Sequence, residues 1–176
     1  MKKIKLNKKY GILFWITGLS GSGKTRIAKR IAGDIRKTYG KTIVLSGDDI
    51  RSIFNLKGYS YKERLNTVFK YCKLAKKITS QNVNVILAVI GMMDVLRAWN
   101  KKNQKNYVEI YIKSDLKKII KAKKKRLYHK KMSKIVGVDI KPEFPKSPSI
   151  TLINDFKKDI NVLSKKLLKK IKKLLY

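Results

Sequence analysis

The sequence is 176 residues long, and its 45 Lys and Arg against 11 Asp and Glu give a formal net charge of +34. A hydrophobic fraction of 43%, with only 3 prolines and 10 glycines, excludes a disordered or collagen-like chain, and the single cysteine excludes an internal disulfide. We expect one domain, residues 1–176, around a single hydrophobic core.

The positive charge is nearly all lysine. Arginine, whose planar guanidinium binds phosphates and bases in bidentate fashion, occurs only at positions 26, 30, 36, 51, 64, 97 and 126. Lysine, isoleucine, asparagine and tyrosine are all frequent, as an A/T-rich coding sequence produces without selection for a partner. We therefore attribute the charge to composition and do not expect nucleic acid to be a main partner.

No segment of the sequence has the pattern of a membrane span or a signal peptide. The longest apolar stretch, Val83 to Met93, is interrupted by Asn84 and falls short of the ~20 residues that cross a bilayer. The basic N-terminus is not followed by a small-residue cleavage site. We expect a cytoplasmic protein without a membrane partner.

The first half of the chain alternates strands with helices. Tyr10 to Thr17 is a continuous run of β-branched and aromatic residues, which predicts a buried strand. Apolar residues then recur at helical spacing from Thr25 to Tyr39, where Gly40 ends the helix. A second short strand is predicted at Thr42–Leu45, and a second helix at Ser60–Ser80.

The second half continues this alternation. In chain order we expect a strand at Val83–Ile90, a helix at Val95–Lys102, a strand at Tyr107–Ile112, a helix at Asp115–Lys125 capped by Ser114, a strand at Ile150–Ile153 and a helix at Asp155–Leu175. The alternation predicts an α/β fold, with a parallel sheet of about five strands and helices on both faces. Ligands of such sheets bind beyond the carboxyl ends of the strands.

The strongest motif, G-x-x-x-x-G-K-[ST], lies between the first strand and the first helix. It predicts a phosphate-binding loop in a sheet of the P-loop NTPase type, with ATP and Mg²⁺ as ligands. Lys24 is expected to reach the outer phosphates and to act in catalysis, and the Thr25 hydroxyl to ligate Mg²⁺. The loop residues expected to surround the phosphates are Gly18, Ser20, Gly21, Ser22, Gly23, Lys24 and Thr25.

A second polar cluster, Ser46 to Arg51, follows the second strand. Phosphate transfer to a hydroxyl needs a carboxylate to orient the hydroxyl or accept its proton, and cations around the moving charge. Asp48 is our candidate for this base and for a contact with the metal, and Arg51 for binding an anionic acceptor. Either Asp48 or Asp49 alternatively caps the following helix.

With these residues in place, the sequence resembles the adenylylsulfate kinases, P-loop enzymes that phosphorylate the 3′-hydroxyl of adenosine 5′-phosphosulfate. The resemblance covers nearly the whole chain. Its motifs are FWITGLSGSGKT at 14–25, GDDIR at 47–51, GYS at 58–60 followed by Arg64, LYHKK at 127–131, GVD at 137–139 and the spacing of PEFPKSP at 142–148.

The resemblance implies Mg-ATP as phosphate donor, Asp48 as base, and a lid at about 126–140. It also implies that Arg51 and Arg64 bind the acceptor's phosphate groups, that Tyr59 gives one aromatic face for its base, and that the protein is a homodimer. Lys130, on the lid, is a further candidate for contact with the transferred phosphate, although it is alternatively one more solvated lysine.

The departures from the family fall in the acceptor site. Ser46 stands where the family usually has Asp, and Phe69 where an arginine is expected. Ile135 stands where the family has a Phe that stacks on the acceptor adenine, and the lid is shorter. Losing one aromatic face relaxes the preference for a purine.

We therefore expect ATP-dependent phosphorylation of the 3′-hydroxyl of a small nucleotide. The acceptor is either adenylylsulfate or cytidine diphosphoramidate, the substrate of a variant of the family in capsule phosphoramidate synthesis. A nucleic-acid-associated P-loop protein, such as a polynucleotide kinase, is the alternative suggested by the charge. A nucleotide-binding regulator without catalysis is disfavoured by Asp48.

Overall fold

The computed structural model describes residues 3–122 and 134–176 of the chain. The elements in chain order are β1 (Ile12–Thr17), α1 (Lys24–Tyr39), β2 (Thr42–Ser46), α2 (Gly47–Ile53), α3 (Tyr61–Thr79), β3 (Asn84–Ala88), α4 (Asp94–Asn103), β4 (Asn106–Lys113), α5 (Leu116–Lys121), β5 (Ile150–Ile153) and α6 (Ile160–Leu174).

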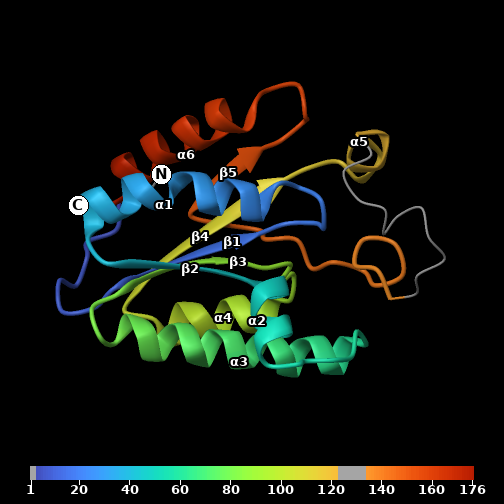
Figure 1. Cartoon of the computed structure of the whole chain (residues 1–176), viewed down its shortest axis with the longest axis horizontal. Helices are drawn as coiled ribbons and strands as arrows, with labels where there is room; N and C mark the ends of the chain where they lie inside the picture. Colours follow the sequence, from blue (N-terminus) through green and yellow to red (C-terminus); the bar gives the residue numbers. More distant parts are fainter. Residues whose placement is uncertain (1–2, 123–133) are drawn as a thin grey trace.

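The five strands form one parallel sheet in the order β2-β3-β1-β4-β5. Helices α1 and α6 cover one face, and α3 and α4 cover the other (Figure 1). This arrangement confirms the α/β fold class expected from the sequence. It also puts the carboxyl ends of all five strands at the same edge of the sheet.

The central position of β1 explains its unbroken apolar run. Phe14 and Ile16 pack in the cluster under α1 and α6, whereas Leu13 and Trp15 pack in the cluster against α3 and α4. All four side chains are fully buried. A strand covered on both faces cannot show the apolar and polar alternation of a half-exposed strand.

Two helix starts differ from the expectation, because the capping residue lies elsewhere. Ser114 does not cap α5; the carboxylate of Asp115 accepts the bond from Lys118 N. α6 begins at Ile160 rather than at Asp155, since Asp159 is its cap and accepts from Asn161 N. The residues before Asp159 therefore form a loop, which borders the site described below.

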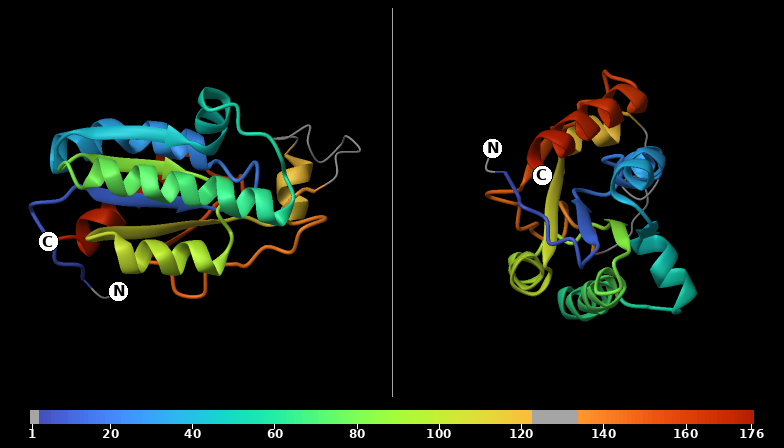
Figure 2. Two further views of the ribbon diagram at one scale, coloured as in Figure 1. Left: turned by 90° about the horizontal axis from the view of Figure 1, so that it is seen from below. Right: turned by 90° about the vertical axis from the view of Figure 1, so that its left-hand side faces the viewer.

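The first and last described segments of the chain lie side by side, near the amino ends of the strands and away from the β1–α1 loop (Figure 2). Ile4 forms a parallel β-bridge with Leu175, and its N–H donates to the Leu174 carbonyl at 2.8 Å. Within the described part of the chain, no helix is long and apolar enough to cross a membrane.

Candidate active site

A cleft of about 700 Å³ opens where the strands end. Its walls come from segments far apart in the sequence: the β1–α1 loop, α2, the N-terminal half of α3, the segment after β3, residues 136–141 and the loop before α6. The sheet thus gathers at one edge the motifs that the sequence separates, as parallel α/β sheets generally do.

The glycine loop has the backbone that a phosphate cradle requires. Gly21 and Gly23 have φ of 80° and 93°, a region that residues with a Cβ rarely adopt. Lys24 is only 8% exposed, and its ammonium donates to the Leu19 carbonyl at 2.7 Å across the loop. The side chain is therefore held in the loop, and it lines the cleft.

Most of the predicted phosphate contacts reach the cleft. The residues of the loop that line it are Ser20, Gly21, Gly23, Lys24 and Thr25. Gly18 and Ser22 do not line it, and Ser22 is fully buried. Their contact with phosphate, which would be made by backbone amides, stays a prediction.

Asn154, directly after β5, ties this loop to the segment before α6 and was not predicted from the sequence. Its amide donates to the Ser22 carbonyl at 3.0 Å and its oxygen accepts from Phe156 N at 3.1 Å. Asn154 is 4% exposed. Phe156 has a positive φ of 66°, unusual for a bulky residue, and this hydrogen bond helps to hold it there.

Replacing Asn154 by alanine should lower the thermal midpoint and raise the KM for ATP about 10-fold. The change leaves the Ser22 carbonyl and the Phe156 N–H without their partner, at a cost of about 1–3 kcal/mol each. Thermal unfolding and initial rates at varied ATP measure the two effects. Asn161→Ala, an exposed position in the first turn of α6, is the control. Equal values for the two variants would contradict the role of Asn154.

Asp48 reaches the cleft from the first turn of α2. Ser46 caps the helix, because its hydroxyl accepts a hydrogen bond from Asp49 N at 3.2 Å. The alternative that Asp48 or Asp49 is the cap is therefore wrong. Asp48 is exposed and lines the cleft, whereas the equally exposed Asp49 does not line it.

Arg51, Tyr59 and Arg64 form a compact group on the same wall. The guanidinium carbons of Arg51 and Arg64 lie 4.6 and 5.0 Å from the centre of the Tyr59 ring. Arg51 donates to the carbonyls of Leu56 and Gly58, and Arg64 donates to the Tyr59 carbonyl at 2.8 Å. The ring thus packs against two cations and still borders the cleft.

The two guanidiniums are suited to an anionic ligand. Burial, and then the charge of Arg51, lower the pKa of Arg64 below its usual value. Within residues 3–122 and 134–176 the ion pairs all involve Arg97, so neither cation has a carboxylate partner there. Asp48 and Asp159 are the acidic residues among those that line the cleft, against Lys24, Arg26, Arg51, Arg64, Lys141, Lys157 and Lys158.

The expected lid, at about 126–140, lies partly outside the described residues. Lys130 lies wholly outside them. Ile135, expected at the acceptor base, is 7% exposed and does not line the cleft. Val136 and Ile140 line it, and the contact of Ile135 with the acceptor base stays a prediction. The tight turn at Gly137, with φ of 96°, places it against Leu19 of the glycine loop.

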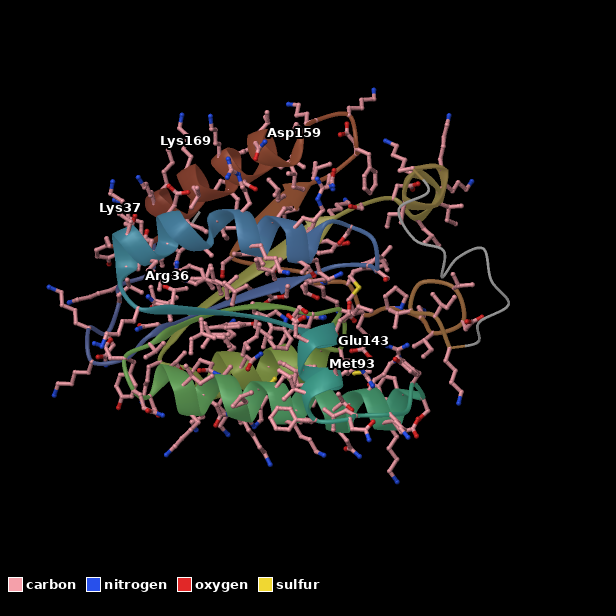
Figure 3. All side chains as sticks on the ribbon, viewed as in Figure 1. Arg36, Lys37, Met93, Glu143, Asp159 and Lys169 are labelled. Carbon is pink, nitrogen blue, oxygen red and sulfur yellow. The ribbon has the colours of Figure 1, made fainter. Side chains whose placement is uncertain are left out.

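Apolar side chains also line the cleft, beside its charged residues. They are Val68, Tyr71, Val89, Met92 and Met93. Glu143 fixes the segment after β3, because its carboxylate accepts from Asp94 N and from the Tyr61 hydroxyl, and it lies beside Met93 (Figure 3). Phe69, where the family pattern has arginine, instead packs edge-on against Trp99 with ring centres 6.3 Å apart.

The donor set available for a metal ion is small. In the part of the chain that the structure describes, no group of three or more His, Cys, Asp or Glu side chains is placed to hold one. Thr25 and Asp48 do offer oxygen donors at the cleft. This set fits Mg²⁺, which takes one or two protein oxygens and completes its shell with phosphate oxygens and water.

A glycine loop between a buried strand and a helix, with a lysine in the loop and a carboxylate and two arginines across the cleft, defines a P-loop phosphotransferase that acts on nucleotides. The family model of adenylylsulphate kinase matches residues 10–153. The chain therefore belongs to the adenylylsulfate kinase family.

Individual relatives agree with this assignment. The chain is 37% identical over 147 residues to the cytidine diphosphoramidate kinase of Campylobacter jejuni, covering 81% of this chain and 85% of that protein. It is 34% identical to the adenylyl-sulfate kinase of Bacillus velezensis, covering 83% and 78%. The fold matches the APS kinase of Mycobacterium tuberculosis, solved with AMPPNP and APS, with a TM-score of 0.82, 22% identity, and coverage of 93% and 98%.

Proposed function

We propose that the protein transfers the γ-phosphate of ATP to the 3′-hydroxyl of a small nucleotide. The observation that carries this proposal is the shared cleft, which is lined by Lys24, Thr25, Asp48, Arg51 and Arg64. A triphosphate bound by the glycine loop and an acceptor bound by the two arginines would share this cleft with the Asp48 carboxylate. Holding both reactants in one geometry accounts for much of the rate of phosphoryl transfer.

Each polar group has a defined task in this proposal. Lys24 neutralises the charge that develops on the transferred phosphate, and the amides of the glycine loop bind the donor's phosphates. Thr25 and Asp48 would hold Mg²⁺, which would supply positive charge beside the transferred phosphate. Asp48 also accepts the proton of the attacking hydroxyl, and Arg51 and Arg64 bind the acceptor's own anionic groups.

We further propose cytidine diphosphoramidate as the preferred acceptor. The relative named for this substrate shares 37% of its aligned residues with the chain, against 34% for the adenylyl-sulfate kinase compared above. Of the two positions that the resemblance assigns to the acceptor base, Tyr59 is aromatic and lines the cleft, whereas position 135, where the family has Phe, is isoleucine and does not line it. A site with one stacking face loses part of the advantage that a purine has over a smaller base.

The test is an ADP-release assay with cytidine diphosphoramidate and adenylylsulfate in parallel. We expect kcat/KM to be at least about 10-fold higher for the cytidine substrate, given that stacking contributes about 1–3 kcal/mol per base. A higher value for adenylylsulfate would assign the protein to sulfate activation instead. If no ADP were released with either compound, the proposal of a nucleotide acceptor related to these two would be rejected.

A further inference from the structure

The position of Asp48 depends on a short helix with few contacts of its own. α2 spans Gly47–Ile53, and Ile50 is its buried residue. Ile53, at its end, is 70% exposed, and the following Phe54 is 58% exposed. A helix of this length is not stable by itself, so its orientation must be fixed from outside.

Tyr71, in the middle of α3, supplies such a fixing contact. Its hydroxyl donates to the carbonyl of Gly47, the residue directly before Asp48, at 3.3 Å. Its ring also borders Gly47, where an added Cβ would lie 3.8 Å from the ring carbon Cε2. Tyr71 is 2% exposed and lines the cleft, so the phenol stands at the junction of α2, α3 and the site.

The Tyr71 hydroxyl stays protonated and can therefore donate this hydrogen bond. Burial raises the pKa of Tyr71 to about 12, with the charge of Arg51 opposing and the charge of Asp48 adding to the shift. The hydroxyl therefore keeps its proton at every pH at which the protein would be assayed. The ring itself is held by the surrounding apolar cluster, which includes Ile50, Val68 and Val89.

We propose that Tyr71 is a positioning residue for phosphate transfer, whose hydroxyl holds the start of α2 so that the Asp48 carboxylate faces the attacking hydroxyl. The inference rests on the proposed function of Asp48. It assigns to Tyr71 an action on turnover through Asp48 rather than a contact with ATP. A small displacement of a reacting group is sufficient to slow an oriented reaction by one or two orders of magnitude.

The first test compares Tyr71→Phe with Tyr107→Phe. Both changes remove one buried hydroxyl, but Tyr107 lies on β4 and does not line the cleft. We expect Tyr71→Phe to lower kcat about 10-fold while the KM for ATP, calorimetric ATP binding and the thermal midpoint stay near those of Tyr107→Phe. Unchanged kcat, or a loss of ATP binding equal to the loss of turnover, would overturn the inference.

The second test separates action through Asp48 from a general structural effect. Single-turnover rates with labelled ATP are measured for Asp48→Asn, Tyr71→Phe and the double variant. If Tyr71 acts by placing Asp48, the double variant should be no slower than Asp48→Asn. A further 10-fold loss in the double variant would reject the positioning role. Normal turnover by Asp48→Asn alone would instead show that the proposed base is wrong.

Discussion

Replacing Lys24 by alanine is expected to abolish measurable ATP binding and to slow phosphate transfer by about 10²–10³-fold or more. The ammonium is fixed across the glycine loop by its bond to the Leu19 carbonyl, at the end of the cleft that we assign to the donor phosphates. Alanine removes this charge from a largely buried position. Calorimetric titration with Mg-ATP and steady-state rates measure the two losses.

Lys29→Ala is the matched control for this change. Lys29 is also on α1, but it is exposed and does not line the cleft. The same loss of one positive charge should leave ATP binding and turnover within about 2-fold of the unmodified protein, because exposed charges are screened by salt. If both variants lost ATP binding equally, overall charge rather than the glycine loop would be responsible.

Asp48→Asn, unlike Lys24→Ala, should retain ATP binding and lose only turnover, with kcat lowered by roughly 10²–10⁴-fold. The amide has nearly the same shape as the carboxylate but cannot accept the proton of the attacking hydroxyl. Because we assign the donor phosphates to the glycine loop, most of the affinity for ATP should survive. Calorimetry and ADP release, measured on the same preparation, separate the two quantities.

The neighbouring residue provides the control. Asp49 is equally exposed in the same turn of α2, yet it does not line the cleft. Asp49→Asn should therefore keep at least about half of the turnover. Normal rates with Asp48→Asn, or equal losses from both changes, would remove Asp48 from the role of base.

The sheet and the glycine loop were predictable because their signals are local. A buried strand, a turn of defined glycines and a helix follow one another within Ile12–Tyr39, and each is read from adjacent residues. The position of Asp48 at the same edge followed from the parallel sheet alone. The order of the elements and the periodicity of their apolar residues can both be read from a single sequence.

The supporting contacts were not predictable because they join distant segments. Asn154 and Ser22 are 132 positions apart, and nothing near either residue indicates the bond between them. Tyr71 falls on the apolar face of a helix, where a core tyrosine and a positioning tyrosine look the same. The bond from its hydroxyl to the Gly47 carbonyl joins residues 24 positions apart, and no local pattern indicates it.

The difference at Ile135 has a simple geometric origin. Alignment to the family motif places this residue at the acceptor base, but in an irregular segment adjacent side chains point in different directions. Here Val136 lines the cleft and Ile135 does not, although both side chains are buried. Which of the two side chains meets the acceptor base stays a prediction.

The pairing of Ile4 with Leu175 has a practical consequence. Since this pairing lies at the end of the sheet remote from the glycine loop, a fluorophore or a surface tether joined to the fold there would be far from the cleft (Figure 2). Immobilised or single-molecule experiments can therefore observe the arrival and departure of substrates without obstructing their path.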